Sequence, residues 1–301
     1  MGKYEGRKIM KLLTYLEDNI EKVGVLTQDE QHIFSIQSAG LDYQDMNELI
    51  EKMTEEEKQC LEKYAKENKG YLKEEIQLEA PIRHPKQDII CLGINYMAHA
   101  IESARYKEEA FGGERPYAVY FSKRVHQAVA DKGIIPRYID LVDSLDYEVE
   151  LAVIIGKDAK DVSKEEAFNY VFGYTIINDV SARDLQTRHK QWYFGKSLDG
   201  FLPMGPYIVT EDEFSRPPVL HISSRVNGEL RQNATTDLLI FGIPHVIAEL
   251  SKGMTLKAGT IIAMGTPAGV GMGMQPPTFL EVGDEVVCEI EKIGTLTNYV
   301  R

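Results

Sequence analysis

Residues 146–157 read DYEVELAVIIGK, and this stretch restricts the fold of the chain more than any other. From Val149 onward, apolar side chains occupy both alternating faces, which is typical of a strand buried on both sides. Glu148 and Glu150 stand at the start of this run, so a strand would point both carboxylates to one face. Like charges that close share either a proton or a cation. The stretch therefore predicts a core strand that begins at a binding site.

Nearby acidic residues indicate which partner the two glutamates could hold. Asp146 lies just upstream, and Asp179 in the segment TIINDVSARD supplies further carboxylate oxygen. Three carboxylates with no Cys or His beside them favour a hard ion such as Mg²⁺, Mn²⁺ or Ca²⁺ over zinc. The alternative is a solvated strand end, where exposed carboxylates cost little. The residues alone leave both interpretations open.

The first 80 residues differ in texture from the rest of the chain. Short β-like runs are followed by two helical segments, which predicts a small α+β domain over 1–80. Thr54 and Glu57 have the capping-box spacing for the second helix, and Gly70 is its expected end. This region contributes few residue types that carry catalysis.

Residues 81–301 are mostly strand-like, with Gly, Pro and Asn between the apolar runs. Helical texture is limited to 163–173 and 237–251, and Asn227-Gly228 carries the signal of a tight hairpin. We therefore predict a mainly β fold with α+β elements, in which 81–301 forms one large domain after the small N-terminal one.

Composition excludes several classes of function. The chain of 301 residues has a net charge of −13, which argues against nucleic-acid binding because that binding neutralises phosphates with Lys and Arg. Its three cysteines are far apart and fit a reducing compartment. The N-terminus has no signal-peptide character, and the apolar runs are too short to span a bilayer. We expect a cytoplasmic protein without a membrane segment.

His99 and Glu102, in the segment GINYMAHAIES, are three residues apart. On a helical turn they would share a face, and a carboxylate beside an imidazole fixes its tautomer and raises its basicity. Such a pair suits a general base. Without other information, a simple surface pair is the alternative interpretation.

Several cations and one Gly-rich segment follow the acidic residues. Arg183, Gln186 and Lys196 could bind a substrate carboxylate, or they could be counter-ions of the acidic cluster. The segment GTPAGVGMG at 265–273 lacks the ending of a P-loop and the spacing of a dinucleotide motif. A tight turn that offers backbone N–H groups or the Thr266 hydroxyl to an anion is better supported.

A series of motifs, taken in order, resembles the fumarylacetoacetate hydrolase family. The resemblance covers roughly residues 86–301, and its specificity comes from the order of the motifs rather than from any single one. The matching segments are IICLGINYMAHAIE, YAVYFSK, DYEVELAVIIGKDA, VFGYTIINDVSARDLQ, QWYFGKSLDGFLPMGPYIVT, VNGELRQ, GTIIAMGTPAGVG and FLEVGDEVVCEIEKIGTLTN. The first 80 residues resemble the variable leader of many bacterial members.

The resemblance implies a mixed β-roll fold, a homodimer and a divalent ion, usually Mg²⁺. It implies that His99 and Glu102 activate water and lie on a segment that closes as a lid, with 103–115 variable among subfamilies. Lys123 matches a family lysine, and the resemblance does not say which group it meets. The implied metal ligands are Glu148, Glu150 and Asp179, and the implied contacts to substrate carboxylate and oxo groups are Lys196, Arg183, Gln186 and Thr266.

The resemblance also implies chemistry on a short 2-oxo or dioxo acid through an enolate that a bound cation stabilises. Hydrolysis of a C–C bond in an acylpyruvate ranks first, because the His99–Glu102 pair is intact. Decarboxylation of an oxaloacetate-type acid ranks second, and enol–keto isomerisation third. A non-catalytic carboxylate-binding protein is the alternative from another class.

Overall fold

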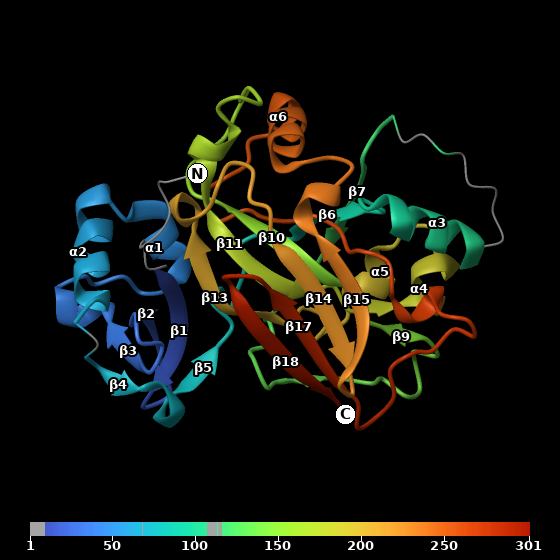
Figure 1. The fold of residues 1–301 in the computed structure, drawn as a ribbon, viewed down its shortest axis with the longest axis horizontal. Coiled ribbons are helices and arrows are strands. Elements are labelled where there is room, and N and C mark those ends of the chain that lie inside the picture. The colour runs from blue at the N-terminus through green and yellow to red at the C-terminus, as the bar shows by residue number, and fades with distance from the viewer. Residues whose placement is uncertain (1–9, 68, 107–112, 114–115) are drawn as a thin grey trace.

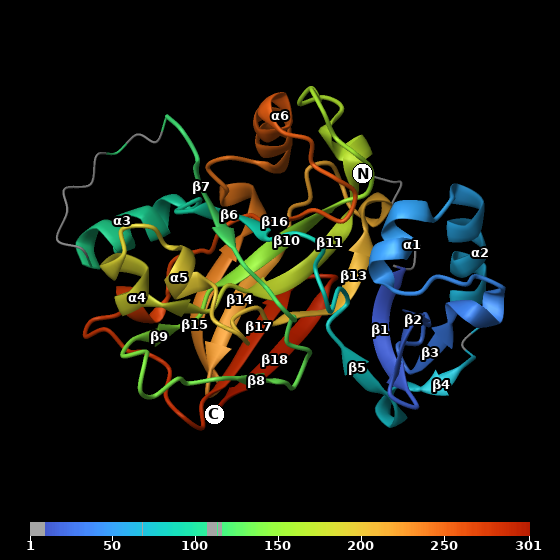
Figure 2. The same cartoon turned by 180° about the vertical axis from the view of Figure 1, so that it is seen from behind.

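One large mixed sheet runs through most of the computed structural model, which describes residues 10–67, 69–106, 113 and 116–301 (Figures 1 and 2). Among these residues the sheet has eleven strands, with β5 (Gln77–Glu79) paired to β1 outside the main order. The main order is β4 (Tyr71–Leu72), β3 (His32–Ser35), β2 (Ile20–Leu26), β1 (Lys11–Glu17), β13 (Met204–Thr210), β11 (Val171–Asn178), β10 (Val149–Ile155), β16 (Ile261–Ala263), β6 (Ile89–Gly93) and β7 (Val119–Lys123).

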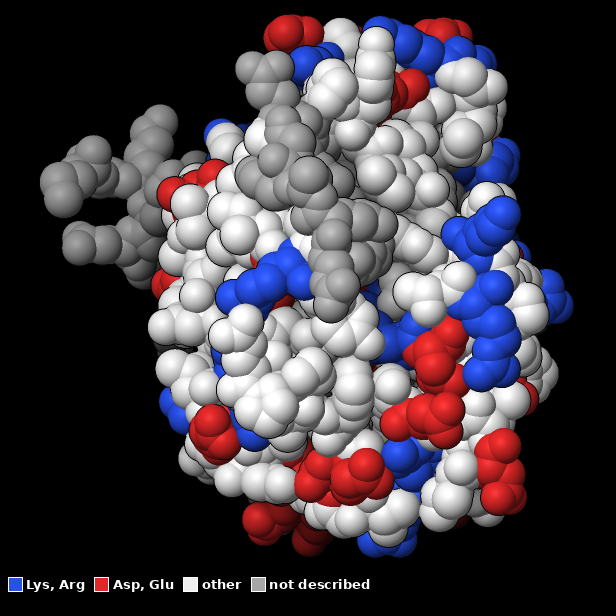
Figure 3. Space-filling view, turned by 90° about the vertical axis from the view of Figure 1, so that its right-hand side faces the viewer, with Lys and Arg blue, Asp and Glu red and all other residues white. Residues whose placement is uncertain are grey.

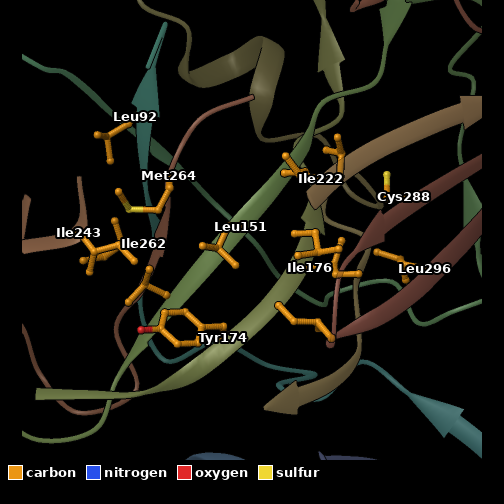
Figure 4. Packing of buried hydrophobic residues seen from close by; sticks show 14 of the residues in the cluster. Leu92, Leu151, Tyr174, Ile176, Ile222, Ile243, Ile262, Met264, Cys288 and Leu296 are labelled. Atoms are coloured by element: carbon orange, nitrogen blue, oxygen red, sulfur yellow. The ribbon is translucent and has the colours of Figure 1, made fainter. Parts of the chain in front are cut away.

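A smaller sheet packs against the central strands of the large one. Its order is β15 (Glu229–Thr235), β14 (His221–Val226), β17 (Glu285–Ile290), β18 (Gly294–Val300) and β8 (Ile134–Ile135), and a separate pair joins β9 (Leu145–Asp146) to β12 (Ser181–Ala182). Figure 4 shows the core between the sheets, where Leu151 and Ile176 lie with Ile222, Cys288 and Leu296. Burial of these apolar faces is the main stabilising term of such a fold.

Six α-helices occur in the described ranges, and they gather at the two ends of the molecule and above the sheets (Figure 1). α1 and α2 cover the N-terminal strands, whereas α3, α4 and α5 lie together at the opposite end. None of these helices is long and apolar enough to cross a membrane. Their bounds are α1 (Met46–Lys52), α2 (Glu55–Ala65), α3 (Met97–Tyr106), α4 (Arg183–Arg188), α5 (Tyr193–Lys196) and α6 (Ile243–Gly253).

The predicted local signals are confirmed in part. The capping box is present, since Thr54 accepts from the Glu57 N–H while the Glu57 side chain accepts from the Thr54 N–H. The helix ends at Ala65, so Gly70 as its end is wrong. The hairpin is confirmed, with Asn227 and Gly228 at positive φ between β14 and β15.

The predicted helix over 163–173 is wrong. Only one 3-10 turn forms there, Ala167–Tyr170, and the chain then enters β11 at Val171. Val171 begins a run of residues with high β propensity, and its pairing with β10 outweighs a single capping signal.

The mainly β fold class is confirmed, and the large sheet extends into the N-terminal region. β1 pairs with β13 in antiparallel register, with Lys11 opposite Val209 and Leu12 opposite Ile208. The domain boundary near residue 80 stays a prediction. The face that carries α3 shows Lys and Arg interspersed with Asp and Glu rather than a continuous basic area (Figure 3).

Candidate active site

Three carboxylates meet where β10 and β11 lie side by side. Glu148 directly precedes β10, Glu150 lies on it and Asp179 directly follows β11. Their oxygens come within 4.8 Å of one another, and the residues are 5%, 1% and 0% exposed. The pairing of the two strands causes this approach, since the Asp179 N–H donates to the Glu148 carbonyl at 2.8 Å. Their burial excludes the solvated strand end.

Three buried cations hold two of these carboxylates. Lys196 Nζ lies 2.8 Å from Glu148 Oε2 and 2.7 Å from Asp179 Oδ2. Arg183 Nη1 lies 2.7 Å from Glu148 Oε1, and Lys123 Nζ lies 2.7 Å from Asp179 Oδ1. The sequence left the partner of Lys123 open, and the structure places it against Asp179.

Among the described residues no cation forms an ion pair with Glu150, and its carboxylate is the least compensated of the three. It accepts a hydrogen bond from the Gly265 N–H at 2.8 Å. Burial raises its pKa well above the usual range, and the charges of Asp179 and Glu148 raise it further. Burial also raises the pKa of Glu148, but Lys196 and Arg183 outweigh that effect and lower it overall.

The donor set of the cluster fits a divalent cation, and its charge is of the right sign. Each carboxylate oxygen can accept more than one bond, so the contacts to cations leave lone pairs for a metal ion. The donor set is all oxygen, as Mg²⁺ and Mn²⁺ prefer. Counting Asp146, four buried carboxylates face three buried cations, which leaves one excess negative charge among these described residues: Asp146, Glu148, Glu150, Asp179, Lys123, Arg183 and Lys196.

Asp146 organises the site from outside the metal cluster. One carboxylate oxygen accepts from the N–H groups of Tyr147 and Gly271, at 2.9 and 2.7 Å. The other accepts from the Met272 N–H at 3.0 Å and from Arg183 Nε at 2.8 Å. These four bonds use the carboxylate fully, so Asp146 orients Arg183 and the Gly-rich loop together.

Arg183 offers one unused donor to the cavity. Its Nε binds Asp146, and its Nη1 binds Glu148 and the Gln186 side-chain oxygen at 3.1 Å. Among the described residues, Nη2 is buried without a hydrogen-bond partner. A buried unpaired donor is costly unless a ligand satisfies it. The guanidinium is therefore held ready for an anionic or carbonyl oxygen.

His99 and Glu102 form a buried pair on α3. His99 Nδ1 lies 3.0 Å from Glu102 Oε2, and the residues are 4% and 8% exposed. The carboxylate also accepts from the Gly269 N–H at 3.0 Å. Because an ionised carboxylate can only accept, the neutral imidazole carries its proton on Nδ1 and has its lone pair on Nε2. The surface-pair interpretation is wrong.

The Gly-rich loop packs closely against α3. Arg105 Nη2 donates to the Gly273 carbonyl at 2.5 Å, and a Cβ at Gly273 would lie only 1.9 Å from Glu102 Cδ. The observed position of the Glu102 side chain therefore requires glycine at this point. Most of the predicted lid segment 103–115 lies outside the described residues, which end at Tyr106 on this side and resume, after residue 113, at 116.

Replacing Gly273 with alanine is expected to lower kcat/KM about 100-fold, because the added methyl group displaces Glu102 and hence His99 by a fraction of an ångström or more. Steady-state kinetics with thermal denaturation measures this. Gly253→Ala is the matched control, since nothing lies within 4 Å of a Cβ there. Unchanged kinetics in Gly273→Ala would show that activity does not depend on the observed position of the Glu102 side chain.

Seven of the nine predicted site residues line one small cavity. Its volume is about 30 Å³, space for one or two waters. The other two, Asp179 and Glu102, do not line the cavity but bind Lys196 and His99, which do. The predicted residues that line the cavity are His99, Glu148, Glu150, Arg183, Gln186, Lys196 and Thr266.

Three further residues of the site carry roles that sequence reasoning missed. Asp146 is not among the implied metal ligands, and no sequence signal shows that it orients Arg183. Gln232 lies in the matched segment VNGELRQ, yet nothing in its spacing shows that it reaches Thr266. Gly273 belongs to the Gly-rich segment 265–273, and nothing in that segment shows that this glycine contacts Glu102.

The site thus combines a buried cluster of carboxylates that could hold a metal ion, an oriented histidine, and a guanidinium with one unpaired nitrogen, Arg183 Nη2. A profile described as "Fumarylacetoacetate (FAA) hydrolase C-terminal" matches residues 88–301. The chain belongs to the fumarylacetoacetate hydrolase family.

The relatives that carry functional names include a tautomerase and two hydrolases. Oxaloacetate tautomerase YisK from Bacillus subtilis is 49% identical over 230 residues, covering 76% of this chain and 75% of that protein. A fumarylacetoacetate hydrolase structure from Exiguobacterium antarcticum is 39% identical with a TM-score of 0.81, covering 97% of this chain and 99% of that one. Fumarylpyruvate hydrolase from Pseudomonas aeruginosa, solved with Mn²⁺ and pyruvate, is 30% identical with a TM-score of 0.63, covering 74% of this chain and 91% of that one.

Proposed function

We propose that this protein is a divalent-metal-dependent enzyme that interconverts the enol and keto forms of a short 2-oxo diacid of the oxaloacetate type. The observation that carries the proposal is the buried His99–Glu102 pair beside three carboxylates in one small cavity. The motifs alone rank C–C hydrolysis first. The 49% identity to an oxaloacetate tautomerase moves proton transfer ahead of it.

Different residues of the cavity would bind the metal ion and the substrate carboxylate. A Mg²⁺ or Mn²⁺ ion held by Glu148, Glu150 and Asp179 would polarise the 2-oxo group and stabilise the negative charge of the enolate. Arg183 would donate from Nη2 to a substrate carboxylate, which satisfies its unpaired donor. Gln186 would keep the guanidinium in that orientation through its bond to Nη1.

Proton transfer falls to the pair on α3. His99 Nε2 would take the proton from the carbon beside the 2-oxo group, and the protonated ring would return it to the enolate oxygen. Glu102 would stabilise the imidazolium through Nδ1 at 3.0 Å. Because the proton moves between the substrate and His99, this step consumes no water molecule, unlike hydrolysis.

Hydrolysis of an acylpyruvate is the second candidate. The same His99 Nε2 could activate a water for attack on a distal carbonyl, and the similarity to a fumarylpyruvate hydrolase favours this use of the pair. Decarboxylation needs the same enolate without a base. A non-catalytic carboxylate-binding protein stays the remote alternative, and a cytoplasmic homodimer stays a prediction.

Assays with and without EDTA test the proposal. With Mg²⁺, enol–keto conversion of oxaloacetate is expected to be faster than the uncatalysed reaction. EDTA is expected to lower kcat/KM at least about 1,000-fold, because a metal Lewis acid contributes several kcal/mol to stabilisation of the transition state. A parallel panel of 2,4-dioxo acids measures hydrolysis. Turnover of dioxo acids alone would make the second candidate correct, and metal binding without any turnover would favour the binding protein.

A further inference from the structure

β11 pairs with β10 along one edge at Val149, whereas on the other edge the Val149 backbone is held by side chains rather than by a neighbouring strand. Val149 lies between Glu148 and Glu150, and both of its backbone polar groups are bonded to side chains. Its N–H donates to Gln232 Oε1 at 3.1 Å, and its carbonyl accepts from Thr266 Oγ1 at 2.9 Å. The neighbouring strand β16 pairs with β10 only over residues 152–154, so its ladder does not reach Val149.

Gln232 and Thr266 are bonded to each other as well. Gln232 Nε2 donates to Thr266 Oγ1 at 2.6 Å and to the Pro267 carbonyl at 2.8 Å. Gln232 Oε1 also accepts from the Ser224 hydroxyl at 2.8 Å. The amide therefore uses two donors and two accepted bonds, which is its satisfied state, and the residue is 0% exposed.

The donor and acceptor roles in this arrangement have one solution. The Val149 N–H must face the amide oxygen of Gln232, so the amide nitrogen must face Thr266. Thr266 then accepts from that nitrogen and gives its single proton to the Val149 carbonyl. Its hydroxyl has no proton left for a substrate carboxylate, so the substrate contact implied by the resemblance could use the hydroxyl only as an acceptor.

We propose that Gln232 and Thr266 are positioning residues for the metal centre: together they clamp the Val149 peptide and thereby fix the two carboxylates on either side of it. The proposal rests on the metal site of the proposed function. A small rotation of the Val149 backbone would move Glu148 and Glu150 in opposite senses and spoil the spacing of their oxygens, now within 4.8 Å. Partners of this kind typically change metal affinity about 10- to 100-fold.

Mn²⁺ titration by calorimetry, on the full chain without substrate, tests the clamp. Gln232→Met and Thr266→Val are expected to weaken Mn²⁺ binding about 10- to 100-fold, whereas Thr266→Ser keeps the hydroxyl and is expected to stay within about twofold of the wild type. Ser224→Ala is the matched control, because it removes a bond to the same Gln232 oxygen without touching Val149.

The outcomes separate the clamp from the metal site itself. Folded Gln232→Met and Thr266→Val proteins that bind Mn²⁺ like the wild type would overturn the clamp and leave the proposed function intact. If Gln232→Met does not fold, the comparison of Thr266→Val with Thr266→Ser decides alone, and equal affinities for Mn²⁺ overturn the proposal. A wild-type protein that binds no Mn²⁺ would overturn the metal centre and the clamp together.

Discussion

Glu150→Gln is expected to leave a folded protein that has lost at least about 1,000-fold in kcat/KM and about 100-fold or more in Mn²⁺ affinity. The amide keeps an oxygen for the Gly265 N–H, so the local hydrogen bond survives. The substitution nevertheless removes the negatively charged carboxylate that would bind the cation. Calorimetric Mn²⁺ titration and steady-state kinetics measure the two losses.

The same substitution is expected to preserve or raise the melting temperature in EDTA. Glu150 is buried beside Asp179 and Glu148 and has no ion-pair partner among the described residues, so its charge destabilises the metal-free protein. Glu281→Gln, at an exposed carboxylate that pairs with Arg137, serves as the control for loss of one charge. Wild-type Mn²⁺ affinity in Glu150→Gln would exclude this residue as a ligand.

His99→Ala is expected to separate the three reactions. Loss of a positioned general base typically costs about 100- to 10,000-fold, and that loss should appear in enol–keto conversion and in dioxo-acid hydrolysis. Decarboxylation of oxaloacetate should fall much less, because the bond to CO₂ breaks without a base. Rates for all three substrates on one enzyme preparation provide the measurement.

His221→Ala is the control for this experiment, since that histidine lies exposed on β14 and binds Asn233. Mn²⁺ affinity should be nearly unchanged in His99→Ala, because His99 is not among the three clustered carboxylates. An equal loss of all three reactions, with metal affinity retained, would mean that His99 has a role other than that of the base.

The acidic cluster was predictable because its geometry follows from strand periodicity. Glu148 and Glu150 share a face by their spacing, and the motif order placed Asp179 with them. His99 and Glu102 share a face for a similar reason, as three residues are close to one helical turn. The restriction of helices to 163–173 and 237–251 was wrong, however, because α3, α4 and α5 also form in this part of the chain. Local rules of this kind need no knowledge of the rest of the fold.

Contacts across the fold were not predictable from one sequence. Gln232 and Val149 are far apart in the chain, and their bond depends on how the small sheet packs against β10. The fit of Gly273 against Glu102 depends on where α3 docks. The helix predicted over 163–173 was wrong for a related reason. The end of that segment pairs with β10 as part of β11, although its local signal favoured a helix.

The pairing of β1 with β13 has a consequence for how this chain can be shortened. The family motifs lie after residue 86, which invites removal of the N-terminal region. A truncated chain would expose the backbone N–H and C=O groups of β13 that now bind β1. A bare hydrophobic strand edge recruits other chains, so aggregation rather than loss of chemistry is the expected first symptom of truncation.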